Sequence, residues 1–134
     1  MEKYRSTEDY LERIYMLSKT SKVRSIDIAT DMGFTKASVS VAMKKLRENG
    51  YITFDRNNYI ELTESGKALA IKVYEKHVVI SQALMILGVP ESIASEDACM
   101  IEHVLSDTSF EAIKQHISKY EENWITIKNT HKLY

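Results

Sequence analysis

The fold is decided by residues 25–50, which read SIDIATDMGFTKASVSVAMKKLRENG. Apolar residues recur at helical spacing on both sides of Gly33, which is expected to end a first short helix. Thr35 can cap a second helix, and Gly50 follows its last turn. Two helices joined by the short turn 33–35 form a helix-turn-helix candidate.

Two short runs of β-branched and aromatic residues follow at once, at residues 51–54 and 59–62. They flank the polar segment 55–58, which is rich in turn-forming residues, and this arrangement predicts a β-hairpin. A hairpin directly after a helix pair is typical of a winged helix. Upstream, the periodicity predicts a helix from about residue 7 to residue 19, with acidic residues in its first turn.

The second half of the chain is expected to be entirely helical. Thr63 can cap a long helix that is apolar on nearly every side from His77 to Leu87, and a helix of this kind lies in a core or between subunits. Further helices are expected around residues 98–105 and from Thr108, where Thr-Ser-Phe-Glu fits a capping box, with a last short segment through Trp124 and Ile127. The sequence therefore predicts a mainly α protein with one small hairpin, divided into a winged helix-turn-helix domain (1–63) and a helical domain (64–134).

Composition limits the classes of function. The chain has 134 residues, 44% of them hydrophobic, and a single cysteine, so it can form a packed core but no internal disulfide. No stretch has the character of a signal peptide or a membrane span, and we expect a cytoplasmic protein. Residues 21–60 carry seven basic and four acidic side chains, whereas residues 91–134 carry four lysines and eight acids. This asymmetry indicates a part that faces a polyanion and a part with another role.

The second helix of the helix-turn-helix has the composition of a recognition helix. Val39, Met43 and Leu46 form its inward stripe, which leaves hydroxyl and lysine side chains for phosphates and base edges. An ordinary solvated helix face would look similar, but the order of the elements favours DNA binding. The expected DNA-contacting residues are Thr35, Lys36, Ser38, Ser40, Lys44 and Lys45 in the helix and Arg56, Asn57 and Asn58 in the hairpin.

Metal-binding side chains are spaced to converge on helix faces. Asp9 and Glu12 lie three residues apart, and Cys99, Glu102 and His103 follow an i, i+3, i+4 pattern. His77 lies in the long apolar helix. Oxygen, imidazole and thiolate donors together suit a first-row divalent ion (Mn²⁺, Fe²⁺, Co²⁺ or Zn²⁺) better than Ca²⁺ or Mg²⁺.

Each of these residues also has an ordinary structural explanation. Asp9 and Glu12 can complement a helix N-terminus, Cys99 can be a small core residue, and His77 can be a hydrogen-bonded buried histidine. A Glu-His pair such as Glu102-His103 is common on helices.

The order of motifs resembles that of the metal-dependent repressors typified by the diphtheria toxin repressor and the manganese transport regulator. The motifs are the segment 8–17 (EDYLERIYML), the winged helix, the segment 62–66 (LTESG), His77 and the segment 97–106 (DACMIEHVLS). The resemblance implies a DNA-binding homodimer that represses metal-uptake genes at a pseudo-palindromic operator. It places the metal ligands at Asp9, Glu12, His77, Cys99, Glu102 and His103, and makes the helical domain the dimerisation and metal-binding domain.

The resemblance does not identify the metal, because two of the candidate ligands match different branches of the family. Asp9 is similar to the manganese-responsive branch and Cys99 to the iron-responsive branch, so Mn²⁺ and Fe²⁺ both remain candidates. Three other functions are compatible with some of these residues: a winged-helix regulator that senses an organic ligand or an oxidant through Cys99, a metal-independent DNA-binding protein, and a small metalloenzyme. The last is not expected, because no residue beyond the metal-ligand candidates supplies a general base or a substrate cleft.

Overall fold

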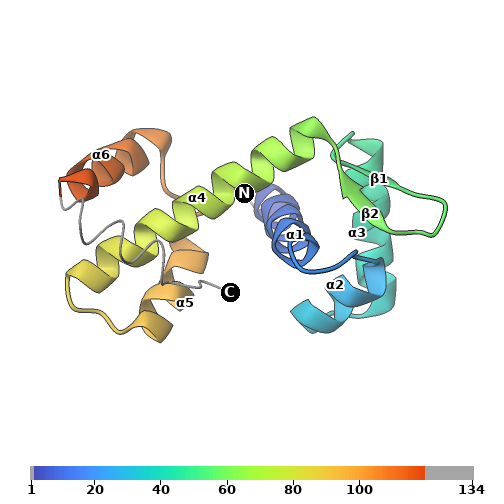
Figure 1. Ribbon diagram of the computed structural model, residues 1–134, viewed down its shortest axis with the longest axis horizontal. Helices are drawn as coiled ribbons and strands as arrows, with labels where there is room; N and C mark the ends of the chain where they lie inside the picture. The colour runs from blue at the N-terminus through green and yellow to red at the C-terminus, as the bar shows by residue number, and fades with distance from the viewer. Residues whose placement is uncertain (1, 120–134) are drawn as a thin grey trace. The chain divides into compact units, whose positions relative to one another are not determined.

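The computed structural model describes residues 2–119, with side chains from residue 7 onward. Its contacts divide the chain into two compact units, Met1–Lys72 and Val73–Tyr134. The described elements confirm a mainly α fold with one two-stranded antiparallel hairpin (Figure 1). In chain order they are α1 (Glu2–Ser18), α2 (Ser25–Met32), α3 (Lys36–Glu48), β1 (Ile52–Phe54), β2 (Ile60–Leu62), α4 (Glu64–Ile86), α5 (Glu91–Ile101) and α6 (Asp107–Ser118).

The helix-turn-helix forms as its sequence predicts. Gly33 adopts a left-handed conformation with φ of 70°, which ends α2 at little steric cost because glycine has no Cβ. The Thr35 hydroxyl then accepts a hydrogen bond from the backbone N–H of Ser38 and caps α3. α2 and α3 are thereby joined by a turn of only three residues.

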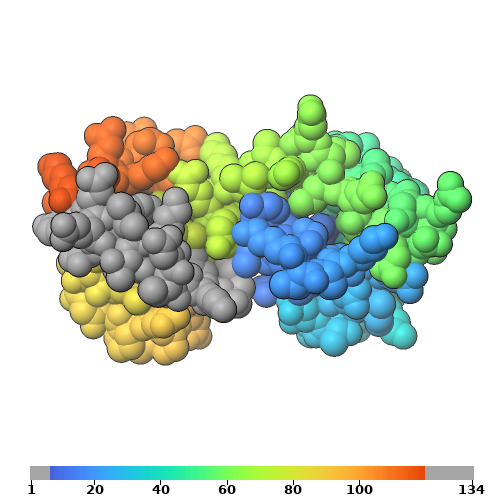
Figure 2. Space-filling view, in the orientation of Figure 1, coloured from blue at the N-terminus to red at the C-terminus, as the bar shows by residue number. Residues whose placement is uncertain are grey.

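The hairpin pairs β1 with β2 in the register Ile52 to Leu62 and Phe54 to Ile60. Its loop is closed by Asp55, whose Oδ1 accepts hydrogen bonds from the backbone N–H groups of Asn57 and Tyr59. The loop projects from the surface of the first unit (Figure 2).

The core of the first unit is apolar and is shared by every element of the winged helix. Val39, Met43 and Leu46 of α3 are buried, as predicted. They belong to one buried cluster with Leu11, Ile14, Val23, Ile28, Ala29, Ile52, Ile60 and Ala70.

The first turn of α4 packs against the start of the hairpin. A Cβ at Gly66 would lie 2.0 Å from the backbone oxygen of Tyr51, so this approach requires glycine. Thr63 caps α4 as predicted, because its hydroxyl oxygen accepts a hydrogen bond from the Gly66 N–H. The same hydroxyl donates to the backbone oxygen of Gly50, which fixes the start of α4 to the loop between α3 and β1.

In the second unit, two different faces of α4 contact α6 and α5. Val79 and the half-buried Ala83 pack against Phe110 and Ile117 of α6. His77 contacts residues of α5 and its C-terminal end, and α4 runs between the other two helices (Figure 1). No helix within residues 2–119 is both long enough and apolar enough to cross a membrane.

The helix boundaries differ from the sequence-based expectation in three places. α1 begins at Glu2 rather than near residue 7, since neither proline nor glycine interrupts the preceding residues. α5 begins directly after Pro90 and ends at Ile101, whereas a helix over 98–105 was expected. α6 begins at Asp107 because Ser106, not Thr108, caps it by accepting a hydrogen bond from the Ser109 N–H. The segment expected through Trp124 and Ile127 lies outside the described residues.

Candidate metal centre and nucleic-acid interface

The second unit contains a buried cluster of three different donor types. His77 of α4 is fully buried, and its Nδ1 lies 2.9 Å from Oε2 of Glu102 and 3.6 Å from Sγ of Cys99. The donor atoms of these three residues all lie within 4.8 Å of one another. The structure therefore brings together residues that the sequence separates by 22 to 25 positions.

The spacing of these donors fits a shared metal ion. First-row ions bind nitrogen, oxygen and sulfur at about 2.0–2.3 Å, so neighbouring ligands of one ion lie roughly 3.0–3.7 Å apart. The separations of 2.9 and 3.6 Å are close to this range. Imidazole, carboxylate and thiolate donors are also the ligand types that such ions accept together.

Glu102 lies between two histidines. Its Oε2 faces His77, while its Oε1 is 3.3 Å from Nε2 of His103, whose side chain is 1% exposed. Glu102 is the C-terminal cap of α5 and His103 follows it, so the ligand motif spans a helix end rather than one continuous helical face. The carboxylate can therefore contact both imidazoles.

The other ring nitrogen of His77 contacts a residue that the sequence analysis did not identify. Its Nε2 lies 3.3 Å from the hydroxyl oxygen of Ser95, one turn before Cys99 on α5. This contact orients the ring so that Nδ1 faces Glu102 and Cys99. A serine hydroxyl can donate or accept a hydrogen bond, so Ser95 can contact either tautomer of the imidazole. Nothing in the sequence distinguishes Ser95 from other helical serines.

Asp9 and Glu12 lie on α1, in the first unit, on one helical face as the spacing predicts. Because α1 begins at Glu2, Asp9 lies about two turns inside the helix. The helix dipole acts mainly within the first turn, so charge complementation of the N-terminus does not explain these acids. Burial raises the pKa of Tyr10, and the neighbouring Asp9 carboxylate adds to the rise.

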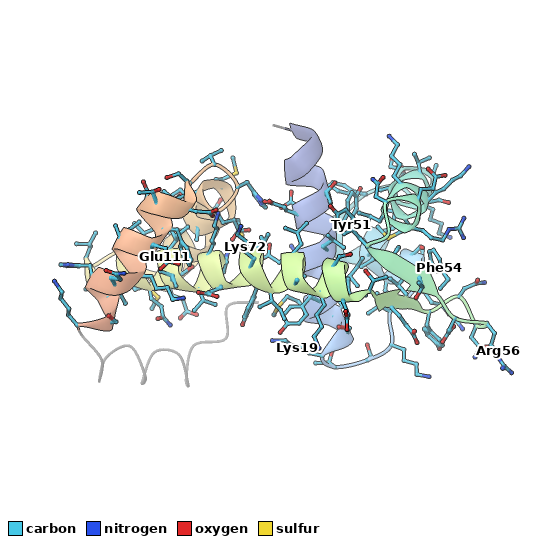
Figure 3. All side chains as sticks on the ribbon, turned by 90° about the horizontal axis from the view of Figure 1, so that it is seen from above. Lys19, Tyr51, Phe54, Arg56, Lys72 and Glu111 are labelled. Atoms are coloured by element: carbon cyan, nitrogen blue, oxygen red, sulfur yellow. The ribbon has the colours of Figure 1, made fainter. Side chains whose placement is uncertain are left out.

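The expected DNA-contacting residues of α3 are all exposed. The Thr35 hydroxyl, besides capping α3, donates a 2.9 Å hydrogen bond to the hydroxyl of Ser38, so these two side chains also serve the helix start. In the hairpin loop, Arg56 points away from the helices of the first unit (Figure 3). The exposed polar set comprises Thr35, Lys36, Ser38, Ser40, Lys44, Lys45, Arg56, Asn57 and Asn58.

Two arginines that the sequence analysis did not single out as DNA contacts lie beside this set. An open hollow of about 570 Å³ between α2, α3 and the hairpin is lined by Arg24, Lys44 and Arg47, among others. The Arg24 guanidinium stacks over the Tyr59 ring at 4.3 Å. Three cations around one hollow suit a phosphate of a nucleic acid backbone, and their positive charge is a signal that the sequence carried.

The first unit is thus a winged-helix DNA-binding module, and the second is a helical module with a cluster of metal-ligand types. Comparison with known proteins identifies both. Residues 4–58 match the model of the iron dependent repressor N-terminal DNA binding domain, and residues 63–124 match that of the iron dependent repressor metal binding and dimerisation domain.

Relatives align along most of the chain. An uncharacterised HTH-type transcriptional regulator of Methanocaldococcus jannaschii is 37% identical over 87% of this chain and 96% of its own. The HTH-type transcriptional regulator MntR of Bacillus subtilis is 33% identical over 88% of this chain and 84% of its own. The solved structure of the manganese regulator SloR matches with a TM-score of 0.74 and 32% identity over 84% of this chain; the chain spans 53% of that structure's length.

The chain belongs to the family of iron-dependent repressors and manganese transport regulators. The prediction of a metal-dependent, DNA-binding transcriptional repressor is confirmed, and the family consists of DNA-binding repressors rather than enzymes. In this family the N-terminal domain binds DNA, and the C-terminal domain binds metal and dimerises.

Proposed function

We propose that this chain is a manganese- or iron-activated repressor of metal-uptake genes. The metal is held by His77, Cys99, Glu102 and His103 together with Asp9 and Glu12 of α1. The observation that supports this most is the buried cluster in which His77 Nδ1 lies 2.9 Å from Glu102 and 3.6 Å from Cys99. Imidazole, carboxylate and thiol groups bind a metal ion in their deprotonated forms, so metal affinity would fall as the pH is lowered.

The donor set leaves the choice of metal between two ions. The carboxylates of Asp9, Glu12 and Glu102 favour a hard ion such as Mn²⁺, whereas the thiolate of Cys99 favours Fe²⁺ or a softer ion. SloR is a manganese regulator, which supports Mn²⁺. Co²⁺ and Zn²⁺ are expected to bind the same residues in vitro, since they accept all three donor types.

Asp9 and Glu12 of the DNA-binding domain (1–63) and the four candidate ligands of the helical domain (64–134) would hold the ion. When bound, it would favour the domain arrangement that binds DNA. The protein's own residues supply the rest: α3 enters the major groove, the lysines and Arg24 contact phosphates, and the hairpin contacts the backbone or the minor groove.

The active species is a homodimer in the cytoplasm that binds a pseudo-palindromic operator, because a two-fold protein dimer matches two half-sites. Apolar surface at the end of α4 supports dimerisation: Leu87 is 80% exposed. It borders a hollow of about 370 Å³ that is also lined by Ile86, Ile113 and Ile117. Exposed apolar patches of this kind are typical of protein interfaces.

The test is binding to a fluorescent DNA fragment from the protein's own promoter region, titrated with Mn²⁺, with Fe²⁺ under anaerobic conditions and with Zn²⁺. We expect tighter DNA binding with metal, and loss of that response in the double variant Glu102→Ala, His103→Ala. Glu111→Ala is the matched control, because it removes an exposed carboxylate of the same unit. DNA affinity that is unchanged by any of these metals would contradict the proposal.

A second candidate function is thiol-based sensing through Cys99. The imidazole of His77, 3.6 Å from Sγ, can favour the reactive thiolate form. Alkylation of the full chain with iodoacetamide separates the two functions. A metal ligand is protected from the reagent by Mn²⁺ or Zn²⁺, whereas a thiol sensor reacts equally fast with and without metal and loses DNA binding once alkylated.

A further inference from the structure

The outward face of the recognition helix carries an apolar side chain. Val41 is 56% exposed, although the residues flanking it in α3 are mainly hydroxyl and lysine side chains. At about 100° per residue, position 41 lies roughly 160° around the helix from Val39 and Met43, the buried stripe. Val41 is therefore on the side of α3 that points directly away from the core of the first unit.

Val41 also forms a ridge between two hollows. The hollow of about 570 Å³ lies on one flank with Ser40 and Lys44, and another of about 540 Å³ lies on the other flank with Ser38 and Lys45. Val41 lines both. One turn earlier on the same face, Ala37 is exposed and also presents only a methyl group. An apolar line thus runs along the helix between two rows of polar and cationic side chains.

This arrangement matches the chemistry of one base. Base-pair edges in the major groove carry hydrogen-bond donors and acceptors, and the one large apolar group among them is the 5-methyl of thymine. A helix that enters the groove places its outward line against base edges and its flanks toward the phosphates. Val41 can form no hydrogen bond there, so it would leave the polar atoms of a guanine or cytosine edge unsatisfied.

We propose that Val41 is a specificity-determining residue that recognises the 5-methyl group of a thymine in each operator half-site. The inference rests on the proposed function, because it requires α3 to bind in the major groove. It adds a base preference that neither the metal cluster nor the lysines can supply, since phosphate contacts carry no direct sequence information.

The test begins with duplexes selected from a random-sequence library by the full chain with Mn²⁺. Each thymine of a selected duplex is then replaced singly by deoxyuridine, which lacks only the 5-methyl group. We expect one replacement per half-site to weaken wild-type binding by about fourfold, the effect of losing one buried methyl contact. The same replacement is expected to have little effect on Val41→Ala, whereas Val41→Ile retains the thymine preference.

Ile26→Ala is the matched control, because Ile26 is 42% exposed and lines the same first hollow from α2. This variant is expected to keep the wild-type response to deoxyuridine. If wild type and Val41→Ala respond equally to every replacement while binding stays sequence-specific and metal-dependent, the role of Val41 is wrong and the proposed function stands. If the library yields no metal-dependent, sequence-specific duplex with Mn²⁺ or, under anaerobic conditions, with Fe²⁺, both are overturned.

Discussion

The two units bury different kinds of side chain. The first unit has a continuous apolar core to which α1, α2, α3 and the hairpin all contribute. Among the described residues of the second unit, the apolar cluster has three buried members, and four polar side chains are buried as well: His77, Ser81, Gln82 and Glu102. Burial of ionisable and amide groups is unfavourable unless they are hydrogen-bonded or coordinated. We therefore expect the first unit, in which Glu12 is the buried charged side chain among the described residues, to be stabilised mainly by apolar packing. The second unit is expected to gain more of its stability from a bound ion.

The largest expected effect is in the first unit. Ile28→Ala removes a fully buried side chain from the apolar core, and the free energy of unfolding should fall by about 2–5 kcal/mol. Chemical denaturation with and without Mn²⁺ measures this loss. The increment in stability produced by Mn²⁺ should be unchanged, because Ile28 is not one of the proposed metal ligands. An increment lost together with the core would contradict the contrast between the units.

The next effect is in the second unit. At a free Mn²⁺ concentration of about 100 times Kd, wild type should gain about 2.7 kcal/mol in unfolding free energy. Glu102→Gln should lose most of that gain, since an amide is a weaker ligand than a carboxylate and cannot neutralise the ion. Thermal unfolding over a range of metal concentrations measures the gain, with Glu111→Gln as the control. Equal gains in all three proteins would place the ion elsewhere.

A smaller effect of opposite sign is expected at Gln82. Its amide is fully buried, and neither polar atom has a hydrogen-bond partner among residues 2–119. Gln82→Met keeps the shape without the polar atoms, so the free energy of unfolding should rise by about 1 kcal/mol. Urea unfolding of the metal-free protein checks this. A loss of stability would mean that the amide has a partner in the folded protein.

The smallest effect concerns the ion pair between Lys114 and Glu75, both partly exposed. The hydrogen bond from Lys114 to Glu75 raises the pKa of the lysine above its ordinary value. A raised lysine pKa stabilises the folded state below the ordinary pKa, and this contribution is lost as the pH rises through the folded-state pKa. Glu75→Gln should therefore be slightly less stable than wild type near neutral pH and equal to it at strongly alkaline pH. A difference that persists at alkaline pH in urea unfolding would contradict this origin.

The sequence predicts the first unit better than the second because its signals are local. Gly33, Thr35 and Gly50 mark helix ends through conformations and caps that depend on adjacent residues, and the structure confirms these boundaries. The start of α5 is set by Pro90, which precedes the first helical residue, Glu91. The helix therefore begins seven residues before the expected start near Ala98. The metal-ligand motif at its far end gave no information about that start.

The candidate metal cluster was predicted in its residue types but not in its contacts. Spacing can place Cys99 and Glu102 on neighbouring turns, but it does not reveal that Glu102 contacts His77 on one side and His103 on the other. The role of Ser95 was missed for the same reason, because its contact with His77 depends on how α5 packs against α4. Such contacts are set by tertiary packing, and a single sequence carries no pattern for them.

The central claim is that the His77, Cys99 and Glu102 cluster binds the regulatory ion. The most direct test is titration of the full chain with Co²⁺ while the absorption spectrum is recorded, because a thiolate bound to Co²⁺ gives a charge-transfer band in the near ultraviolet. We expect this band in wild type, its absence in Cys99→Ser with Co²⁺ still bound, and much weaker Co²⁺ binding in His77→Ala. Identical spectra for wild type and Cys99→Ser would show that the thiolate is not a ligand and would contradict the account.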